Sequence, residues 1–355
     1  MDVAQPQLSV ILPAYNAQSF IKEAIASVLN QTYSNFELIV INDGSIDCTE
    51  EIILSFKDPR IKYIKNETNL KLIQTLNKGV DLAIGEYIAR MDADDICLPT
   101  RFEKEINYLI NNPEVDIVSC FPYNMNMDGR ILCKSSYFSC TRPNACKFVA
   151  IFEPPIMHPG SMFRAHILKE NKYSDKPENY HIEAYELWNR LMYNKNVQGG
   201  MIPEYLLLYR DNITSITHTY VNEQWERHIS LLKKSLLEYL KIETNDSILV
   251  CLATKNAVDN LKSIESAFNL LDEAYKKYID LFIVDKLDIK EIDNWCNQKK
   301  ISILLTTLVS CNKYNDKLIV LGKIIKYIKL LFKAHNMVYI QNRIIRKYNE
   351  MIKYR

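Results

Sequence analysis

Glycine is scarce in this sequence, and so are net charge and long apolar runs. Only eight of the 355 residues are glycine, and only Gly322 follows residue 221. No apolar run reaches the roughly 18 residues that a membrane-spanning helix needs. The net charge of +1 at pH 7 gives no global reason to expect nucleic-acid binding. These absences predict no transmembrane span and leave any charged binding surface to local clusters.

The sequence also lacks a Cys-x-x-Cys pair, although it contains nine cysteines. An odd number without paired spacing argues against both a zinc site and the disulfide framework of a secreted protein. The first residues are polar and include an acid, Asp2, unlike a signal peptide. We therefore expect a cytoplasmic protein.

The rest of the composition is that of a globular protein, with 48% hydrophobic and 25% charged residues. Up to about residue 120, short apolar runs rich in β-branched residues alternate with amphipathic stretches. The expected strands are 8–13, 36–41, 61–64, 86–91 and 115–120, and the main expected helices are 18–30, 72–84 and 100–111. This alternation predicts an α/β domain with a Rossmann-like, mostly parallel sheet and helices on both faces.

The stretch from Gly85 to Asp95 changes abruptly from apolar to acidic. Its β-prone run ends in Asp92, Ala93, Asp94 and Asp95. A buried strand cannot hold three unpaired charges, so the chain must leave the core here. At the carboxyl end of a central strand, such acids lie where open α/β sheets bind ligands, and they suit Mg²⁺ or Mn²⁺ on a diphosphate. The alternative is a solvated acidic turn before the next helix.

Beyond residue 120 the alternation weakens, and the chain later becomes helical and rich in lysine. Residues 121–165 are expected to form loops and short strands, and a helix is expected near 182–194. We divide the chain into a domain at 1–220, a helical extension at 221–312 and a tail at 313–355. The tail has the pattern of a basic amphipathic helix, which suits either an anionic membrane surface or packing against the protein itself.

Seven short motifs occur in an order that resembles glycosyltransferase family 2. They are Ser9 to Asn16, Asn42 to Ser45, Asn69 to Gly79, Gly85 to Asp95, His158 to Arg164, Glu183 to Trp188, and Tyr209-Arg210. Each is weak alone, but their order and spacing are specific. The likeness is greatest to bacterial β-1,3-N-acetylglucosaminyltransferases that extend lipooligosaccharide. The resemblance implies a GT-A fold and an inverting, metal-assisted transfer from a UDP-sugar donor to a glycan or glycolipid acceptor.

The resemblance also implies roles for individual residues. The positions expected to bind the donor are Pro13, Ala14, Tyr15, Asp43, Asn69, Asn77, Asp92 and Ala93. Tyr15 would offer a flat face to the uracil, and Asp43 would accept a hydrogen bond from it. Asp94, with Asp92, would bind Mn²⁺ or Mg²⁺, and Asp95 is the next candidate. Such a metal would neutralise the charge that develops on the departing UDP.

The catalytic base is where the sequence departs from the family. The family carries an acidic pair at the start of the 182–194 helix; Glu183 fills the first position, but the second, an aspartate in the family, is Ala184. Alanine cannot accept the proton of an acceptor hydroxyl. Three explanations are an engineered Asp→Ala change, a base role for Glu183 or Glu186, and a natural inactive homologue. We favour the engineered change, because the surrounding motif residues are intact.

His158 and Arg210 are further candidates. Many relatives carry a histidine that can reach the metal where this chain has Asn212, which leaves His158 as the histidine expected near the site. His158 could instead order the loop before Pro159. Arg210 could contact a phosphate, or it could pair with an acid at the domain edge.

Two related activities fit less well. A processive synthase would carry a Gln-x-x-Arg-Trp motif and transmembrane helices, and a sugar-phosphate nucleotidyltransferase would need glycine and arginine in residues 13–19, which hold neither. We expect a UDP-GlcNAc donor, a terminal galactose of a surface glycan or lipooligosaccharide as acceptor, and a location at the inner face of the cytoplasmic membrane. The alternative is a catalytically inactive nucleotide-sugar binder or assembly partner. Nucleic acid is not an expected partner.

Overall fold

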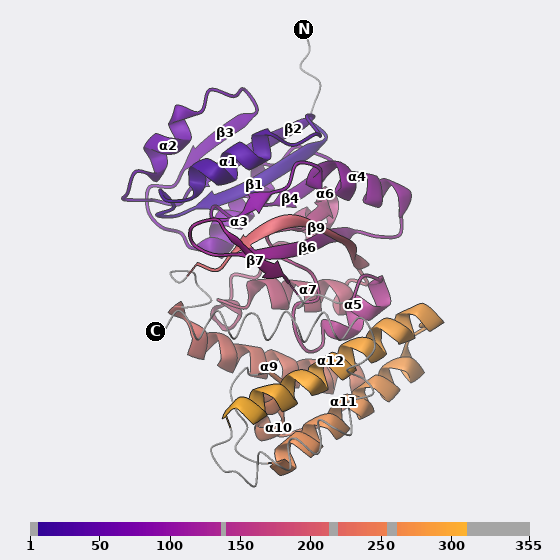
Figure 1. The fold of residues 1–355 in the computed structure, drawn as a ribbon. Coiled ribbons are helices and arrows are strands. Elements are labelled where there is room, and N and C mark those ends of the chain that lie inside the picture. Colours follow the sequence, from indigo (N-terminus) through magenta and orange to yellow (C-terminus); the bar gives the residue numbers. More distant parts are fainter. Residues whose placement is uncertain (1–5, 136–139, 213–218, 254–260, 311–355) are drawn as a thin grey trace. The chain divides into compact units, whose positions relative to one another are not determined.

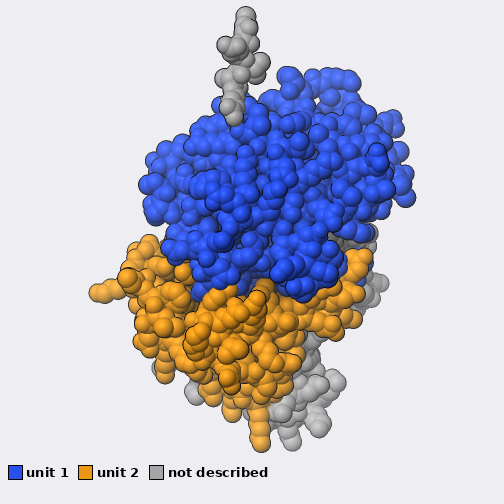
Figure 2. Space-filling view, turned by 180° about the vertical axis from the view of Figure 1, so that it is seen from behind, with its two compact units in different colours: residues 1–135, 156–219 blue, residues 136–155, 220–355 orange. Residues whose placement is uncertain are grey.

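The computed structural model describes residues 6–135, 140–212, 219–253 and 261–310 (Figure 1). The chain divides into two compact units, which Figure 2 colours separately. The first unit comprises residues 1–135 and 156–219, and the second comprises residues 136–155 and 220–355. The expected domain at 1–220 therefore differs from the first unit, because residues 136–155 and Tyr220 belong to the second unit.

The first unit is built on one sheet. Its strands are β1 (Leu8–Ala14), β2 (Phe36–Asn42), β3 (Ile61–Lys65), β4 (Tyr87–Arg90), β5 (Ile96–Cys97), β6 (Ile117–Met125), β7 (Ile131–Lys134), β8 (Met162–Arg164) and β9 (Gly199–Arg210). Their spatial order is β3-β2-β1-β4-β8-β6-β9-β5, with β7 paired to β6. The strands β3, β2, β1 and β4 are parallel, as are β6 and β9. The ladders made by β5, β7 and β8 are short and antiparallel. The mostly parallel sheet predicted from the sequence is confirmed.

Helices follow most of these strands. They are α1 (Ile21–Leu29), α2 (Thr49–Ser55), α3 (Leu72–Leu82), α4 (Arg101–Asn111), α6 (Ala165–Glu170) and α7 (Glu183–Asn194), with a 3₁₀ turn at Pro177–Asn179. Helix α3 contains Gly79, where a Cβ atom would lie 2.5 Å from Ile11 Cγ2 on β1. The glycine therefore lets α3 pack closely on the strand whose end forms part of the candidate site.

The second unit is helical. It contains α5 (Pro143–Val149), α9 (Val221–Leu240), α10 (Asp246–Ala253), α11 (Leu261–Leu281) and α12 (Lys286–Ser310). Its core includes Phe148, whose ring centroid lies 5.1 Å from that of Tyr278 and 5.8 Å from that of Trp295. The predicted C-terminal helical extension is confirmed, but the prediction of only loops and short strands at 121–165 was wrong for α5.

In the part of the chain that the structure describes, no helix is both long and apolar enough to cross a bilayer. The eight cysteines among these residues are all free thiols. The tail at 313–355, on which the expected membrane contact depends, lies outside the described residues.

Candidate functional site

The carboxyl ends of β1, β2 and β4 lie at one edge of the sheet. Ala14 is opposite Asn42 in the register of β1 and β2, and β4 pairs with β1 on its other side. Because these strands are parallel, the segments that leave them meet at this edge. Pro13 and Ala14 are buried in β1, whereas Tyr15, the first residue beyond it, is 48% exposed. An exposed ring in this position is able to stack on a planar ligand.

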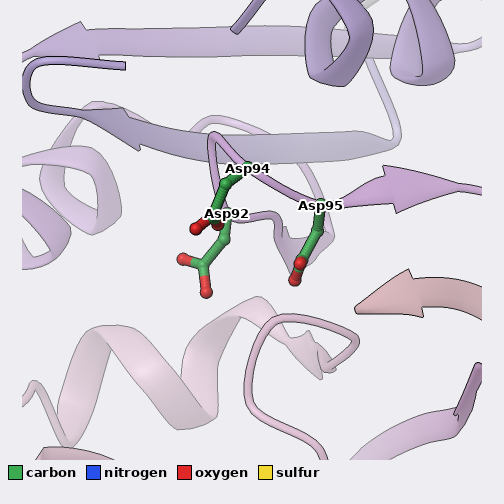
Figure 3. Close-up of side chains that lie close together, drawn as sticks. All are labelled: Asp92, Asp94 and Asp95. Carbon is green, nitrogen blue, oxygen red and sulfur yellow. The ribbon is translucent and has the colours of Figure 1, made fainter. Parts of the chain in front are cut away.

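The three acids Asp92, Asp94 and Asp95 form a cluster just after β4 (Figure 3). One carboxylate oxygen from each lies within 4.8 Å of those of the other two. Burial, and then the charge of Asp92, raises the pKa of Asp94. Burial raises the pKa of Asp95 well above its usual range, and Asp95 Oδ2 has no hydrogen-bond partner among the described residues. Crowded carboxylates with an unpaired buried oxygen fit a site for Mg²⁺ or Mn²⁺.

Arg210 and Asn212, at the end of β9, hold the acidic turn. The Arg210 backbone N–H donates to Asp95 Oδ1 at 2.9 Å, and its Nε donates to the Asp94 carbonyl at 2.7 Å. Its Nη2 pairs with Glu23 at 2.8 Å. Asn212 Nδ2 donates to Asp94 Oδ2 at 2.9 Å. Of the two expectations for Arg210, pairing with an acid agrees with these contacts, and its buried guanidinium positions the turn.

Arg90 is the last residue of β4, and no role is predicted for it from the sequence. Its side chain is 6% exposed, and its Nη2 lies 2.5 Å from Asp92 Oδ1. Its Nε and Nη1 are buried without a hydrogen-bond partner among the described residues. Its carbonyl accepts a 2.9 Å hydrogen bond from Arg101, which forms a fully buried ion pair with Glu105. The signal that could have identified Arg90 is an arginine inside an apolar strand, because a buried cation needs a partner.

Asp43, just after β2, binds the loop that precedes α3. Its Oδ1 accepts hydrogen bonds from Asn66 Nδ2 at 2.8 Å and from the Leu70 N–H at 2.9 Å. Gly44 has φ +71° and brings its backbone against the same loop. Asn69 accepts a 2.9 Å bond from the N–H two residues later. Asp43 and Asn69 thus hold the loop before α3 in place at this edge of the sheet. Their contact with a nucleotide stays a prediction.

His158 and Asn77 both contact Tyr173, which the sequence did not single out. His158 Nε2 lies 2.8 Å from the Tyr173 hydroxyl oxygen. Asn77 accepts from the Tyr173 N–H at 3.0 Å and donates to its carbonyl at 2.9 Å. Burial, and then the charge of Arg90, lowers the pKa of His158 well below its usual range, so the imidazole is neutral. The group of potential metal ligands among the described residues does not include His158.

Glu183 and Ala184 begin α7, at the place where the sequence predicts a helix. Burial raises the pKa of the Glu183 carboxyl, the charge of Arg90 opposes this rise, and the charge of Asp92 adds to it. Backbone hydrogen bonds from Glu183 and His181 also lower its pKa. Glu183 makes no ion pair among the described residues. Glu186 instead forms an ion pair with Arg190, one helical turn later, at 2.7 Å. Of the two glutamates, Glu183 is therefore the one whose carboxyl is affected by the charge of Asp92 and, among the described residues, is free of an ion pair.

Sequence comparisons place the chain among transferases. A family model described as glycosyl transferase family 2 matches residues 9–170. An uncharacterised glycosyltransferase of Haemophilus influenzae is 30% identical over 352 residues, which cover 94% of this chain and 99% of that protein. The O-antigen biosynthesis glycosyltransferase WbnJ of Escherichia coli is 32% identical over 254 residues, or 69% of this chain and 93% of WbnJ.

A comparison with solved structures finds proteins that share the fold of this chain. The crystal structure of residues 1–349 of S. aureus TarS in complex with UDP-GlcNAc superposes with a TM-score of 0.54. The match covers 83% of this chain and 91% of that chain, at 18% sequence identity. At this identity the similarity shows a shared fold.

Proposed function

The chain belongs to glycosyltransferase family 2, and on this basis we propose that it transfers one sugar from a UDP donor to a glycan, inverting the anomeric carbon. The proposed donor is UDP-GlcNAc, and the proposed acceptor is a terminal galactose of a surface glycan or lipooligosaccharide. The name of WbnJ, which refers to O-antigen biosynthesis, supports a glycan acceptor. The UDP-GlcNAc bound to TarS supports the donor.

The observation that carries this proposal is the cluster of Asp92, Asp94 and Asp95 at the carboxyl edge of the sheet, with oxygens within 4.8 Å of one another. A nucleoside diphosphate leaves with negative charge, which three bare carboxylates would repel. Bound Mg²⁺ or Mn²⁺ would neutralise that charge. The three aspartates would hold the ion, and Arg210 keeps their turn in place.

The nucleoside would lie beside the ends of β1 and β2. Tyr15 would stack on the uracil, next to the buried residues Pro13 and Ala14. Asp43 would accept a hydrogen bond from the base. Asn77 fixes the backbone of Tyr173 and so acts on the site indirectly, by positioning His158.

The acceptor hydroxyl needs a base on the face of the sugar opposite the diphosphate. The family position for this base is Ala184, which cannot take a proton. If Ala184 replaces an aspartate by engineering, restoring that aspartate returns the base. If the chain works as it stands, Glu183 is the better candidate than Glu186, since Glu186 is held by Arg190 at 2.7 Å.

The test is UDP release with Mn²⁺, measured with UDP-GlcNAc, UDP-GalNAc, UDP-Gal and UDP-Glc, with and without a β-galactoside acceptor. We expect the fastest release with UDP-GlcNAc and the acceptor, and a gain of at least about 100-fold in Ala184→Asp. A chain that releases UDP from none of the four donors, before or after that substitution, would contradict the proposed transfer. No gain in Ala184→Asp over an active parent would reject the engineered change and point to Glu183.

One alternative function is favoured by a specific residue. Ala184 also suits a catalytically inactive nucleotide-sugar binder or assembly partner. Binding of UDP with Mn²⁺, without turnover in either the parent or Ala184→Asp, would support it. In both cases we place the protein at the inner face of the cytoplasmic membrane, with the tail at 313–355 as the expected contact.

A further inference from the structure

Arg90 carries hydrogen-bond donors that no other described residue uses. Its Nη2 lies 2.5 Å from Asp92 Oδ1, but Nε and Nη1 are buried without a hydrogen-bond partner among the described residues. A buried donor that is left unpaired destabilises the folded state. A side chain that keeps two such groups at the edge of a candidate site therefore points to a ligand that supplies the missing acceptors.

The backbone of Arg90 is fixed in the sheet. Its N–H donates to the Ser161 carbonyl, and its carbonyl accepts from Arg101 Nη2, both at 2.9 Å. Arg101 is itself fully buried and paired with Glu105. The sheet thus holds Arg90 at the carboxyl end of β4, directly before the three acids Asp92, Asp94 and Asp95.

The side chain of Arg90 lies on the face of the sheet that α3 and α7 cover. Arg90 is opposite Ile11 of β1 in the register, and α3 packs closely on Ile11. Ile88, two residues before Arg90, is opposite Phe163 of β8. The ring of Trp188 in α7 stacks on Phe163 with the centroids 5.5 Å apart. Because opposed residues, and residues two apart on one strand, share a face of a sheet, the guanidinium projects toward this side.

The neighbours of Arg90 on this side include His158 and Glu183. Burial has the largest effect on the pKa of both groups, and the charge of Arg90 acts to lower the pKa of each. His158, Glu183 and Asp92 are all partly exposed, so a ligand can approach the surroundings of Arg90 from solvent. The guanidinium therefore acts both on the acids after β4 and on the start of α7.

The charges around Arg90 favour a neutral ligand for its free donors. Asp92 already compensates the positive charge of Arg90, and Glu183 is a further carboxyl group near it. A phosphate there would meet these carboxyl groups, whereas a hydroxyl can accept from a guanidinium N–H and donate to a carboxylate. A sugar ring offers several hydroxyls. In a UDP-sugar, that ring is bonded to the diphosphate that the acids after β4 would hold through a cation.

We propose that Arg90 recognises the transferred sugar by donating hydrogen bonds from Nε and Nη1 to oxygen atoms of the ring or its substituents. This inference rests on the proposed function, since it requires a nucleotide-sugar donor beside the acids after β4. A site that hydrogen-bonds a substrate oxygen discriminates strongly, because its buried donors stay unpaired with the wrong ligand. Arg90 thus contributes to binding of the sugar and not to binding of UDP itself.

Equilibrium binding to the full-length chain tests this proposal without any need for turnover. Titration calorimetry with Mn²⁺ would give the affinities for UDP, UDP-GlcNAc, UDP-GalNAc, UDP-Gal and UDP-Glc. The quantity compared is the affinity for the tightest-binding UDP-sugar divided by that for UDP, which cancels any change in the metal binding that the two ligands share. Arg90→Lys keeps a cation beside Asp92 but lacks the guanidinium donors. In this variant the ratio should fall at least about tenfold, with no weakening of UDP binding.

Arg60→Lys is the matched control. Arg60 also pairs with an aspartate, Asp58, at 2.7 Å, but it lies by Phe36 at the amino end of β2. Both of its affinities should equal those of the parent. If Arg90→Lys does not fold, Arg90→Gln is judged by the same ratio.

Two results would overturn the role of Arg90 and leave the proposed function intact. One is an unchanged ratio in the Arg90 variants, and the other is an equal weakening of UDP and UDP-sugar binding, which would assign the free donors to the diphosphate. A parent chain that binds none of the four UDP-sugars would instead overturn the proposed function, and the role of Arg90 with it.

Discussion

At the scale of single residues, the acidic turn depends on arginines with different partners. Arg210 donates from Nε to the Asp94 carbonyl and from both terminal nitrogens to other acceptors. Arg90 instead pairs with Asp92, and its Nε and Nη1 are buried without a hydrogen-bond partner among the described residues. A buried donor without a hydrogen-bond partner lowers the free energy of unfolding, so a residue that retains such donors usually has a role other than stability. Here the constraint is the cluster of three carboxylates beside it.

Replacing Arg90 by glutamine should destabilise the metal-free protein more than the metal-bound protein. Without its partner, Asp92 repels two neighbouring carboxylates, at a cost of about 3 kcal/mol, the low end for a buried pair since Asp92 is 26% exposed. A bound cation offsets part of that repulsion. In thermal-shift measurements, Mn²⁺ with UDP should therefore raise the Tm of Arg90→Gln more than that of the parent.

The control for this measurement is Arg60→Gln, which breaks an ion pair with Asp58 at 2.7 Å away from the cluster. Its response to Mn²⁺ and UDP should equal that of the parent. An equal response in Arg90→Gln as well would mean that Arg90 does not act through the acidic cluster.

Glu183 allows a second prediction at this scale, for a chain that turns over as it stands. Glu183→Gln should lower kcat by about 100-fold or more, because the amide cannot accept a proton, while UDP affinity stays unchanged. Glu186→Gln should affect kcat by less than about threefold, since it removes only a pair with Arg190 on the same helix. Equal losses of kcat in the two variants would exclude Glu183 as the base.

At the scale of elements, the loop after β2 depends on a glycine. Gly44 has φ +71°, and a Cβ atom there would lie 2.6 Å from the Thr68 carbonyl carbon. Both the backbone angle and the contact disfavour any side chain. The loop that Asp43 binds would have to move away if a methyl group were added.

Gly44→Ala should therefore raise the KM for the donor. It should also lower the free energy of unfolding by more than the unfavourable backbone φ angle alone would. The matched control is Gly129→Ala, since Gly129 has φ +81° but no atom nearer than 3.8 Å to the added Cβ. The control should lose about 1 kcal/mol of stability and keep its KM. A loss of equal size in both variants would show that contact with Thr68 is unimportant.

The sequence predicted the elements whose signals are local, and it missed those that depend on distant partners. Strands such as β1 are continuous apolar runs, and the acids of Asp92 to Asp95 interrupt such a run visibly. Helix α5 has no such signal, because its Phe148 packs against Tyr278 of α11 and Trp295 of α12, more than a hundred positions later. The pairing of His158 with Tyr173 was likewise invisible, since no local spacing specifies it.

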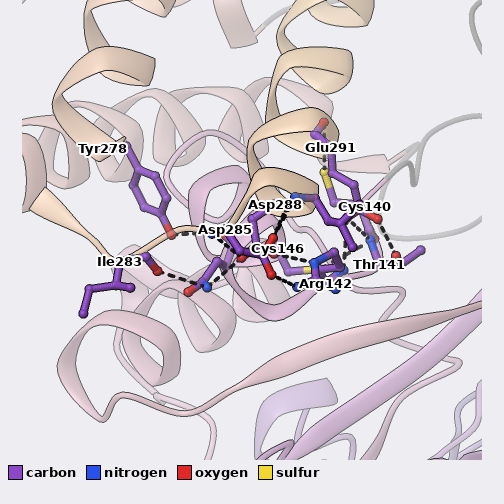
Figure 4. A network of polar contacts seen from close by, with 11 residues as sticks. Cys140, Thr141, Arg142, Cys146, Tyr278, Ile283, Asp285, Asp288 and Glu291 are labelled. Atoms are coloured by element: carbon purple, nitrogen blue, oxygen red, sulfur yellow. Dashed lines mark hydrogen bonds and ion pairs between the residues drawn. The ribbon is translucent and has the colours of Figure 1, made fainter. Parts of the chain in front are cut away.

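At the scale of the whole molecule, residues 136–155 leave the first unit to join helices that follow residue 220. Phe148 and Phe152 are buried there, and the ring centroid of Phe152 lies 5.2 Å from that of Trp295. Trp295 Nε1 also donates to Glu153 at 3.0 Å. The sequence of the first unit is therefore interrupted by a segment that, among the described residues, packs with the C-terminal helices (Figure 4).

Truncating the chain after residue 219 should consequently leave this segment uncovered and cause aggregation, even though the sheet is intact. Phe148 and Phe152, each at most 1% exposed in the full chain, would face water. Phe148→Ser with Phe152→Ser should increase the soluble fraction of the truncated chain, measured by centrifugation after lysis. In the full chain the same pair should lower stability, by about 3 kcal/mol or more for each residue. The division into units thus requires that the double substitution raises the soluble fraction of the truncated chain and lowers the stability of the full chain. A truncated chain that is soluble without these substitutions would contradict it.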